Sequence, residues 1–100
     1  MKTLGSTLRE LREGKQLPLR TVAAYLDIDQ AILSRIERGQ RKASREQVIK
    51  LAEYFNANRE ELLVAWLSQK VVYEIIDEDL ALEALKVAEE QVKYIKNKTS

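Results

Sequence analysis

The strongest constraint on this sequence is a break of only three residues, 27–29, between two short amphipathic segments. The segments cover about residues 19–26 and 30–38, and each repeats apolar residues at the spacing of one helix face. Asp27 belongs to the few residue types that tolerate a left-handed backbone, and Asp29 is a favourable N-cap. The pattern predicts two helices joined by a tight turn, with these residues facing inward: Val22, Ala23, Leu26, Leu33 and Ile36.

Further helices are predicted on both sides of this pair. The first covers about residues 3–14, with Thr3 as its cap and Gly14 as its stop. A fourth helix opens with the capping box of residues 44–47. With only three glycines and one proline in 100 residues, the composition favours an all-α fold.

The C-terminal third is predicted to hold two longer helices. One opens at Asn58 and keeps an apolar face as far as residue 76, and the last covers about residues 79–97. Acidic residues are unfavourable at a helix C-terminus and favourable at an N-terminus. We therefore expect one helix to end and the next to begin at this acidic cluster: Glu74, Asp77, Glu78 and Asp79.

The sequence contains no cysteine and no histidine. It therefore has no disulfide, thiol nucleophile, zinc finger or imidazole for acid–base catalysis. The acidic cluster is better explained as helix-end chemistry than as a divalent-metal site. No apolar stretch approaches the roughly 20 residues of a membrane span, and the first six residues lack the apolar core of a signal peptide. We expect a cytoplasmic protein that is no enzyme, carries no cofactor or metal and does not contact membranes.

The two halves of the chain differ in charge, although the net charge is only +1. Residues 1–50 contain eleven Lys or Arg and six Asp or Glu, whereas residues 51–100 contain six and ten. A basic first half is typical of a polyanion-binding surface, although short chains also fluctuate in charge. Any contact with nucleic acid is therefore expected in the first half.

The most specific motif is the run Ser34-Arg35-Ile36-Glu37-Arg38-Gly39, which follows Leu26-Asp27-Ile28-Asp29 and precedes basic residues. Through this run and the further matching positions given at the end of this paragraph, residues 3–64 resemble the phage-repressor/Cro-type, or XRE-type, helix-turn-helix domain. The resemblance implies a five-helix lambda-repressor-like domain over residues 1–64. The apolar pattern of the C-terminal third adds to it an extended fifth helix and an additional C-terminal helix. The resemblance also implies a transcriptional regulator, such as a repressor. The further matching positions are Leu4, Gly5, Leu11, Arg12, Leu17, Val22, Ala23, Leu51, Ala52, Phe55, Leu62 and Leu63.

The resemblance implies that the helix at residues 30–38 lies in the major groove of double-stranded DNA. Gln pairs with adenine, Arg pairs with guanine, and a small apolar side chain meets a thymine methyl group. We expect Gln30 and Arg35 to carry most of the specificity, at about 1–3 kcal/mol per bidentate pair. The alternative is that both are merely solvated surface residues. The expected base-contacting residues are Gln30, Ala31, Ser34 and Arg35.

Other basic and polar residues are expected to bind phosphates, which positions the protein and makes binding salt-dependent. In the resembled family, the positions of Arg12 and Glu37 form an ion pair between the first and third helices. This implies a structural role for the pair here, through orientation more than through net stability. The expected phosphate-contacting residues are Arg20, Thr21, Arg38, Gln40, Arg41 and Lys42.

The sequence departs from the family pattern at three positions. Leu19 stands where the family has an amide that contacts DNA, and Asp27 stands where the turn commonly has glycine. Asp29 replaces a Ser or Thr that bonds a phosphate, and its carboxylate repels one. These departures affect the expected DNA affinity rather than the fold.

Residues 65–100 lie beyond the resemblance and carry more apolar surface than a five-helix core covers. Homodimerisation is the economical interpretation, because two recognition helices about 34 Å apart read successive major grooves of a two-fold operator. One alternative is that this segment folds back on its own domain, and another is a small-molecule pocket beneath Trp66. The expected dimerisation residues are Trp66, Val71, Ile75, Leu80, Leu85 and Val92.

A second function class stays open beside DNA binding. The same fold also suits a protein-interaction module or antitoxin whose C-terminal helices bind another protein, with weak or no DNA binding. The three departures at residues 19, 27 and 29 favour this alternative. A steep salt dependence of DNA binding would argue against it.

Overall fold

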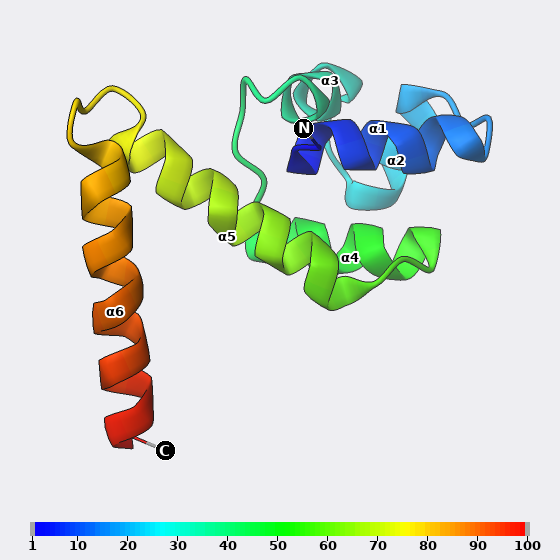
Figure 1. Ribbon diagram of the computed structural model, residues 1–100. Coiled ribbons are helices and arrows are strands. Elements are labelled where there is room, and N and C mark those ends of the chain that lie inside the picture. The colour runs from blue at the N-terminus through cyan, green and yellow to red at the C-terminus, as the bar shows by residue number, and fades with distance from the viewer. Residues whose placement is uncertain (1, 100) are drawn as a thin grey trace. The chain divides into compact units, whose positions relative to one another are not determined.

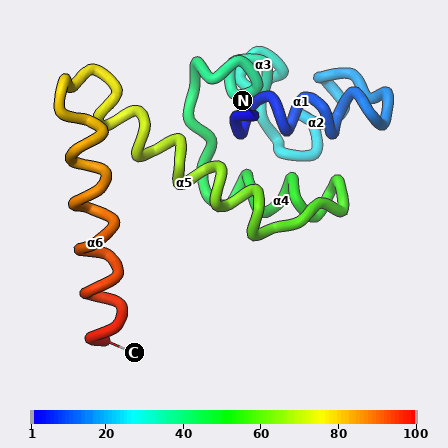
Figure 2. The backbone as a smooth tube through the Cα atoms, in the orientation of Figure 1, coloured from blue at the N-terminus to red at the C-terminus, as the bar shows by residue number. Residues whose placement is uncertain are grey.

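The computed structural model describes residues 2–99 and contains six α-helices, with no strand among those residues. This confirms the predicted all-α class. The chain divides after Lys70 into two compact units, which the continuous tube in Figure 2 allows the reader to follow. We name residues 2–70 the N-terminal unit and residues 71–99 the C-terminal unit. The helices in Figure 1 are α1 Leu4–Gly14, α2 Leu19–Leu26, α3 Gln30–Glu37, α4 Arg45–Phe55, α5 Arg59–Ile75 and α6 Ala81–Thr99.

Polar side chains cap the starts of four helices in the N-terminal unit. Thr3 and Ser44 each form a reciprocal capping box with the residue three positions later, at the starts of α1 and α4. Asp29 accepts a hydrogen bond from an amide in the first turn of α3, and Asn58 does the same for α5. All four caps are confirmed predictions. Only α2 differs, because its N-cap residue, Pro18, makes no side-chain cap hydrogen bond.

The first four helices end in the same way, in a Schellman motif. One residue takes a positive φ between 52° and 73°, and the next residue bonds the carbonyl five positions back. The predicted end of the first helix at Gly14 is confirmed, and beyond it Gln16 takes the left-handed conformation while Leu17 closes the motif against the core. Arg38, predicted inside the third helix, instead follows its last residue. The left-handed residues are Gln16, Asp27, Gly39 and Asn56.

The buried core lies within the N-terminal unit and draws on all five of its helices and on the loop before α4. Trp66 belongs to this core with only 8% of its surface exposed, so its predicted place in a dimer interface is wrong. The physical reason is that its indole Nε1 donates a buried hydrogen bond to the Ala43 carbonyl at 2.7 Å. The core residues are Leu4, Leu8, Val22, Ala23, Leu26, Leu33, Ile36, Ala43, Val48, Leu51, Ala52, Phe55, Leu62 and Trp66.

The C-terminal unit holds the end of α5, a turn and α6. The acidic cluster at residues 74–79 lies where α5 ends, before α6 begins, as predicted from helix-end electrostatics. Helix α6 begins at Ala81, two residues later than predicted, and no residue of α6 is buried. Within residues 2–99, no helix is both long enough and apolar enough to cross a membrane.

Candidate nucleic-acid interface

The turn between α2 and α3 fixes how the two helices pack. Asp27 takes the left-handed conformation with φ 57°, and Ile28 turns inward against the core. Asp29 then caps α3 through a 3.0 Å hydrogen bond from the Ala31 amide to its Oδ1. The turn thereby presents α3 to solvent along one side while Leu33 and Ile36 bury the other.

The outer side of α3 displays the four predicted base-contacting residues together. At about 100° per residue, Gln30, Ser34, Ala31 and Arg35 fall within roughly 140° of the helix circumference. Three of them are exposed and Ser34 is half-buried. Arg38 lies on the same side, but its Nε donates to the Ser34 carbonyl at 3.4 Å. Its positive charge is favourable at this C-terminal end of α3, because the helix dipole is negative there. Arg38 therefore has a structural partner that the sequence did not predict.

Exposed polar and basic residues also occur at two other places, the start of α2 and the loop after α3. Arg20 and Thr21 lie in the first turn of α2, next to a helix start that no side chain caps. Gln40, Arg41 and Lys42 occupy the loop after α3, and all three are exposed. The helix dipole and free amides at the start of α2 favour an anion there.

The carboxylate of Glu37 belongs to α3 but is withdrawn from its outer side. Arg12 of α1 donates from Nε to Oε2 of Glu37 at 2.8 Å and from Nη2 to Oε1 at 3.0 Å. The side chains of Arg12 and Glu37 are only 12% and 6% exposed, and Arg12 Nη1 also donates to the Leu17 carbonyl. The hydrogen bond with Glu37 raises the pKa of Arg12 above its ordinary value, so the guanidinium stays charged. The bidentate pair ties α1 to α3 and neutralises a carboxylate beside the proposed DNA-reading surface.

Gly5 lets α1 approach the C-terminal end of α3, a role that the sequence alone did not reveal. A Cβ atom built on Gly5 would meet the Glu37 carbonyl oxygen and lie 2.7 Å from the Ile36 carbonyl oxygen. Both neighbours are backbone atoms, so neither can swing aside. The available clue was a glycine in the first turn of a helix next to a buried leucine, where helix propensity alone disfavours it.

Trp66 of α5 bonds the loop after α3, residues 40–43, which we name the basic loop. Its indole bonds the carbonyl of Ala43, which follows Lys42 directly and is 5% exposed. The Arg45 guanidinium carbon lies 5.2 Å from the centroid of the indole ring and Lys70 Nζ lies 4.5 Å from it, both within cation–π range. The single tryptophan in an apolar helix face could have indicated such a bond, because a buried tryptophan needs a partner for its N–H.

The three departures from the family pattern have distinct structural places. Leu19 packs against the core and is half-buried, so it offers no polar group to DNA. Asp27 occupies a left-handed position where glycine is the usual residue. Asp29 accepts the capping hydrogen bond of α3 with one carboxylate oxygen, and the residue remains exposed just before the first residue of α3.

The remaining predicted dimerisation residues all belong to the C-terminal unit. Val71, Leu80, Leu85 and Val92 are exposed, and Ile75 is half-buried. They therefore belong to a different unit from Trp66, which is part of the N-terminal core.

Comparison with known proteins matches residues 3–65 to a family model described as a helix-turn-helix domain. The match covers well over half of the chain and includes α1 to α4 and the first part of α5. No curated protein matches the sequence.

Proposed function

Because this chain belongs to the helix-turn-helix domain family, we propose that it is a sequence-specific transcriptional regulator that binds double-stranded DNA as a homodimer. In this proposal α3 lies in the major groove, with Gln30, Ala31, Ser34 and Arg35 at the base edges. The observation that carries the proposal is the outer side of α3, which gathers these four residues while Arg12 withdraws the carboxylate of Glu37.

Phosphate contacts hold α3 in the groove in this proposal. Arg20 and Thr21 bind one strand at the start of α2, and the loop residues Gln40, Arg41 and Lys42 bind the backbone beyond α3. These contacts release counterions, so the affinity falls steeply as salt rises. Arg38 contributes less, because it already binds the carbonyl of Ser34.

A two-fold dimer sets two copies of α3 about 34 Å apart, which is one turn of DNA. The exposed apolar residues of the C-terminal unit form the interface in this proposal. The dimer occupies an operator in the cytoplasm and blocks or recruits RNA polymerase there. We propose no catalytic role, since helix-turn-helix domains typically act by binding.

Selection of bound sites from random DNA duplexes by the purified chain, read by sequencing, tests the proposal. An enriched inverted repeat with half-sites about ten base pairs apart is the expected result. An Arg35→Ala variant should then lose preference at one base pair of each half-site. Arg41→Ala should instead weaken binding to every sequence and reduce the salt slope by about one. Variants that both behave like the wild type would contradict the docking of α3.

A protein-interaction module or antitoxin is the second candidate. The exposed Asp27 and Asp29 carboxylates beside α3 favour it, because they repel phosphates. In this case selection enriches no sequence, and only weak salt-sensitive retention is observed. The C-terminal helices then become the surface on which to seek the partner protein.

A further inference from the structure

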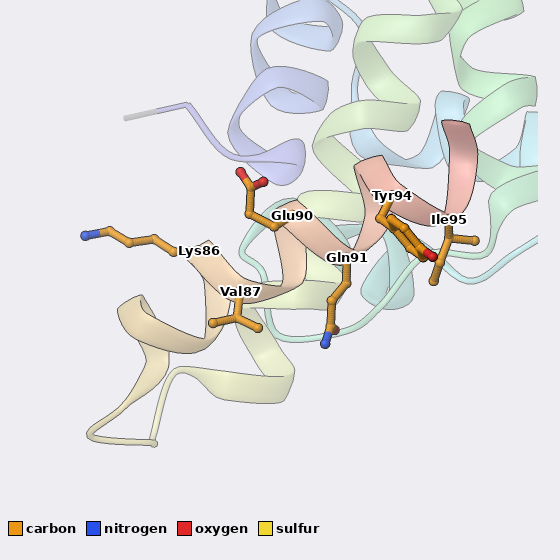
Figure 3. Close-up of a pocket in the computed structure, with 6 residues that line it drawn as sticks. All are labelled: Lys86, Val87, Glu90, Gln91, Tyr94 and Ile95. Carbon is orange, nitrogen blue, oxygen red and sulfur yellow. The ribbon is translucent and has the colours of Figure 1, made fainter. Parts of the chain in front are cut away.

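Helix α6 carries a broad apolar side that nothing in the described chain buries. At about 100° per residue, the apolar residues of α6 gather on half of its circumference. Figure 3 shows one edge of this half, where Val87, Tyr94 and Ile95 line a shallow depression with Gln91, beside the charged Lys86 and Glu90. We name the whole set the α6 apolar side: Ala81, Ala84, Leu85, Val87, Ala88, Val92, Tyr94 and Ile95.

An uncovered helix of this composition calls for a partner. Helical segments owe most of their stability in proteins to the packing of an amphipathic side, and isolated ones are marginal in water. The exposed residues include Val87, Val92, Tyr94 and Ile95, each with more than half of its surface open. A contiguous exposed apolar surface of this kind marks an interface.

The charges along the C-terminal unit indicate which partner fits. Residues 77–85 contain four acidic residues and no basic one, whereas residues 91–99 contain three lysines and no acidic residue. Lys93 lies near Glu89 and Glu90 of its own helix, at 3.2 and 3.9 Å, so the lysines at positions 96 and 98 define the basic end. The acidic and basic ends lie about 28 Å apart, well beyond a Debye length of about 8 Å.

We propose that α6 pairs with α6 of a second copy of this chain, in the antiparallel direction. In that direction the acidic end of each helix lies beside the basic end of the other, and the two apolar sides face each other. A parallel pair would place acid beside acid and lysine beside lysine. This inference rests on the homodimer of the proposed function. It adds that the α6 apolar side forms the interface and that the two helices run in opposite directions.

Small residues in the middle of the α6 apolar side suit this pairing. Ala84 and Ala88 lie near its centre line together with Ile95, and larger residues such as Leu85 and Val87 lie toward its edges. Small side chains let two helices approach closely, while the larger neighbours interdigitate around them. A membrane surface fits less well, because interfacial helices carry mainly Lys and Arg on their polar side, whereas that of α6 mixes Lys with Glu.

Spin labels on single cysteines in the full-length chain test the direction, because the natural sequence contains no cysteine. Leu82 and Asn97 suit labelling, since both lie off the α6 apolar side near opposite ends of the helix. An antiparallel pair centred on α6 separates two labels at position 97 by about 20 Å along the axis. In the same dimer a label at 82 lies only about 2 Å, along that axis, from a label at 97 of the other copy. A parallel pair gives the reverse pattern and overturns the inference.

A matched pair of substitutions tests the surface. Val92→Arg places a charge on the α6 apolar side and is expected to weaken dimerisation at least tenfold, by about 1.4 kcal/mol or more. Leu82→Arg makes the same kind of change off that side and should leave the dimer intact. Equal effects, a monomeric wild type, or a dimer whose labels show neither pattern would each overturn the inference.

These results are independent of DNA binding. A monomer that still enriches a half-site would retain the DNA-binding proposal and lose the α6 pairing. An antiparallel dimer that enriches no sequence would do the opposite. A monomer in which labels on α6 lie close to labels on the N-terminal unit would show that the helix folds back on its own chain, which also overturns the inference.

Discussion

The two units are built from the same kind of sequence and use it differently. Both consist of amphipathic helices with polar breaks between them, yet every buried hydrophobic residue of the described chain belongs to the N-terminal unit. The C-terminal unit instead exposes large apolar residues along α6. The comparison shows that apolar periodicity identifies a helix and its apolar side. It does not show whether other residues of the same chain bury that side.

The units also differ in their ion pairs. The Arg12–Glu37 pair is nearly buried and bidentate, and Arg12 also donates to the Leu17 carbonyl, whereas the Lys93–Glu89 pair on α6 is more than half exposed. Partial burial removes the water that would replace a lost partner, so a broken pair costs more there. Exposed pairs one helical turn apart contribute a few tenths of a kcal/mol.

The largest predicted effect breaks the pair in the N-terminal unit. Glu37→Gln should lower the free energy of unfolding by roughly 3 kcal/mol, because it leaves the charged and nearly buried Arg12 without its carboxylate partner. Lys93→Met, the matched change in the C-terminal unit, should lower it by less than about 0.5 kcal/mol. Urea unfolding followed by fluorescence of the single tryptophan, at one protein concentration, measures both. Similar losses in the two variants would show that burial does not distinguish the pairs.

The next prediction compares two glycines of α1. Gly5→Ala should destabilise the N-terminal unit by about 1–3 kcal/mol, because the new methyl group meets backbone carbonyls at the end of α3. Gly14→Ala has nothing within 4 Å of its new Cβ and should stabilise the chain by up to about 1 kcal/mol. Thermal unfolding of both variants measures the difference. A Gly5→Ala variant as stable as the wild type would mean that α1 and α3 separate at no cost.

The sequence predicted most of the N-terminal fold because local rules determine it. The caps at Thr3, Asp29, Ser44 and Asn58 and the left-handed Asp27 each depend on one residue type at one helix end. The first helix ends at Gly14 as predicted, whereas the left-handed residue after it, Gln16, was not predicted, because its conformation depends on Leu17 packing against the core. The missed roles of Gly5 and Trp66 depend on partners 23 or more residues away, which periodicity does not reveal.

The candidate interface was predictable to a different degree. Helical spacing correctly placed Gln30, Ala31, Ser34 and Arg35 on one side of α3, since inward-facing Leu33 and Ile36 fix the opposite side. The hydrogen bond from Arg38 to Ser34 was not predictable, because a basic residue after a helix suits both a C-cap and a phosphate contact. Which of those residues binds DNA stays a prediction.

A smaller effect is expected at Trp66, which joins the basic loop to α5. Trp66→Phe keeps an aromatic ring and removes the indole N–H, which leaves the buried Ala43 carbonyl without this donor. The free energy of unfolding should fall by about 1–2 kcal/mol, measured by circular dichroism during urea unfolding. DNA affinity should fall for all sequences alike, because the loop that carries Arg41 and Lys42 loosens while α3 stays in place. A change in the preferred sequence would contradict this separation of roles.

The smallest predicted effect compares one carboxylate in each unit. Asp29→Asn preserves the cap of α3, because Asn is an equally good N-cap, so stability should change by no more than a few tenths of a kcal/mol. It removes a negative charge beside the proposed DNA surface and should raise the affinity for DNA about threefold at moderate salt. Asp79→Asn changes the net charge equally but lies in the turn before α6, so it should leave the affinity nearly unchanged. Fluorescence anisotropy titrations at several salt concentrations measure both. Equal gains in the two variants would mean that only net charge matters, and α3 would then not lie against the phosphates.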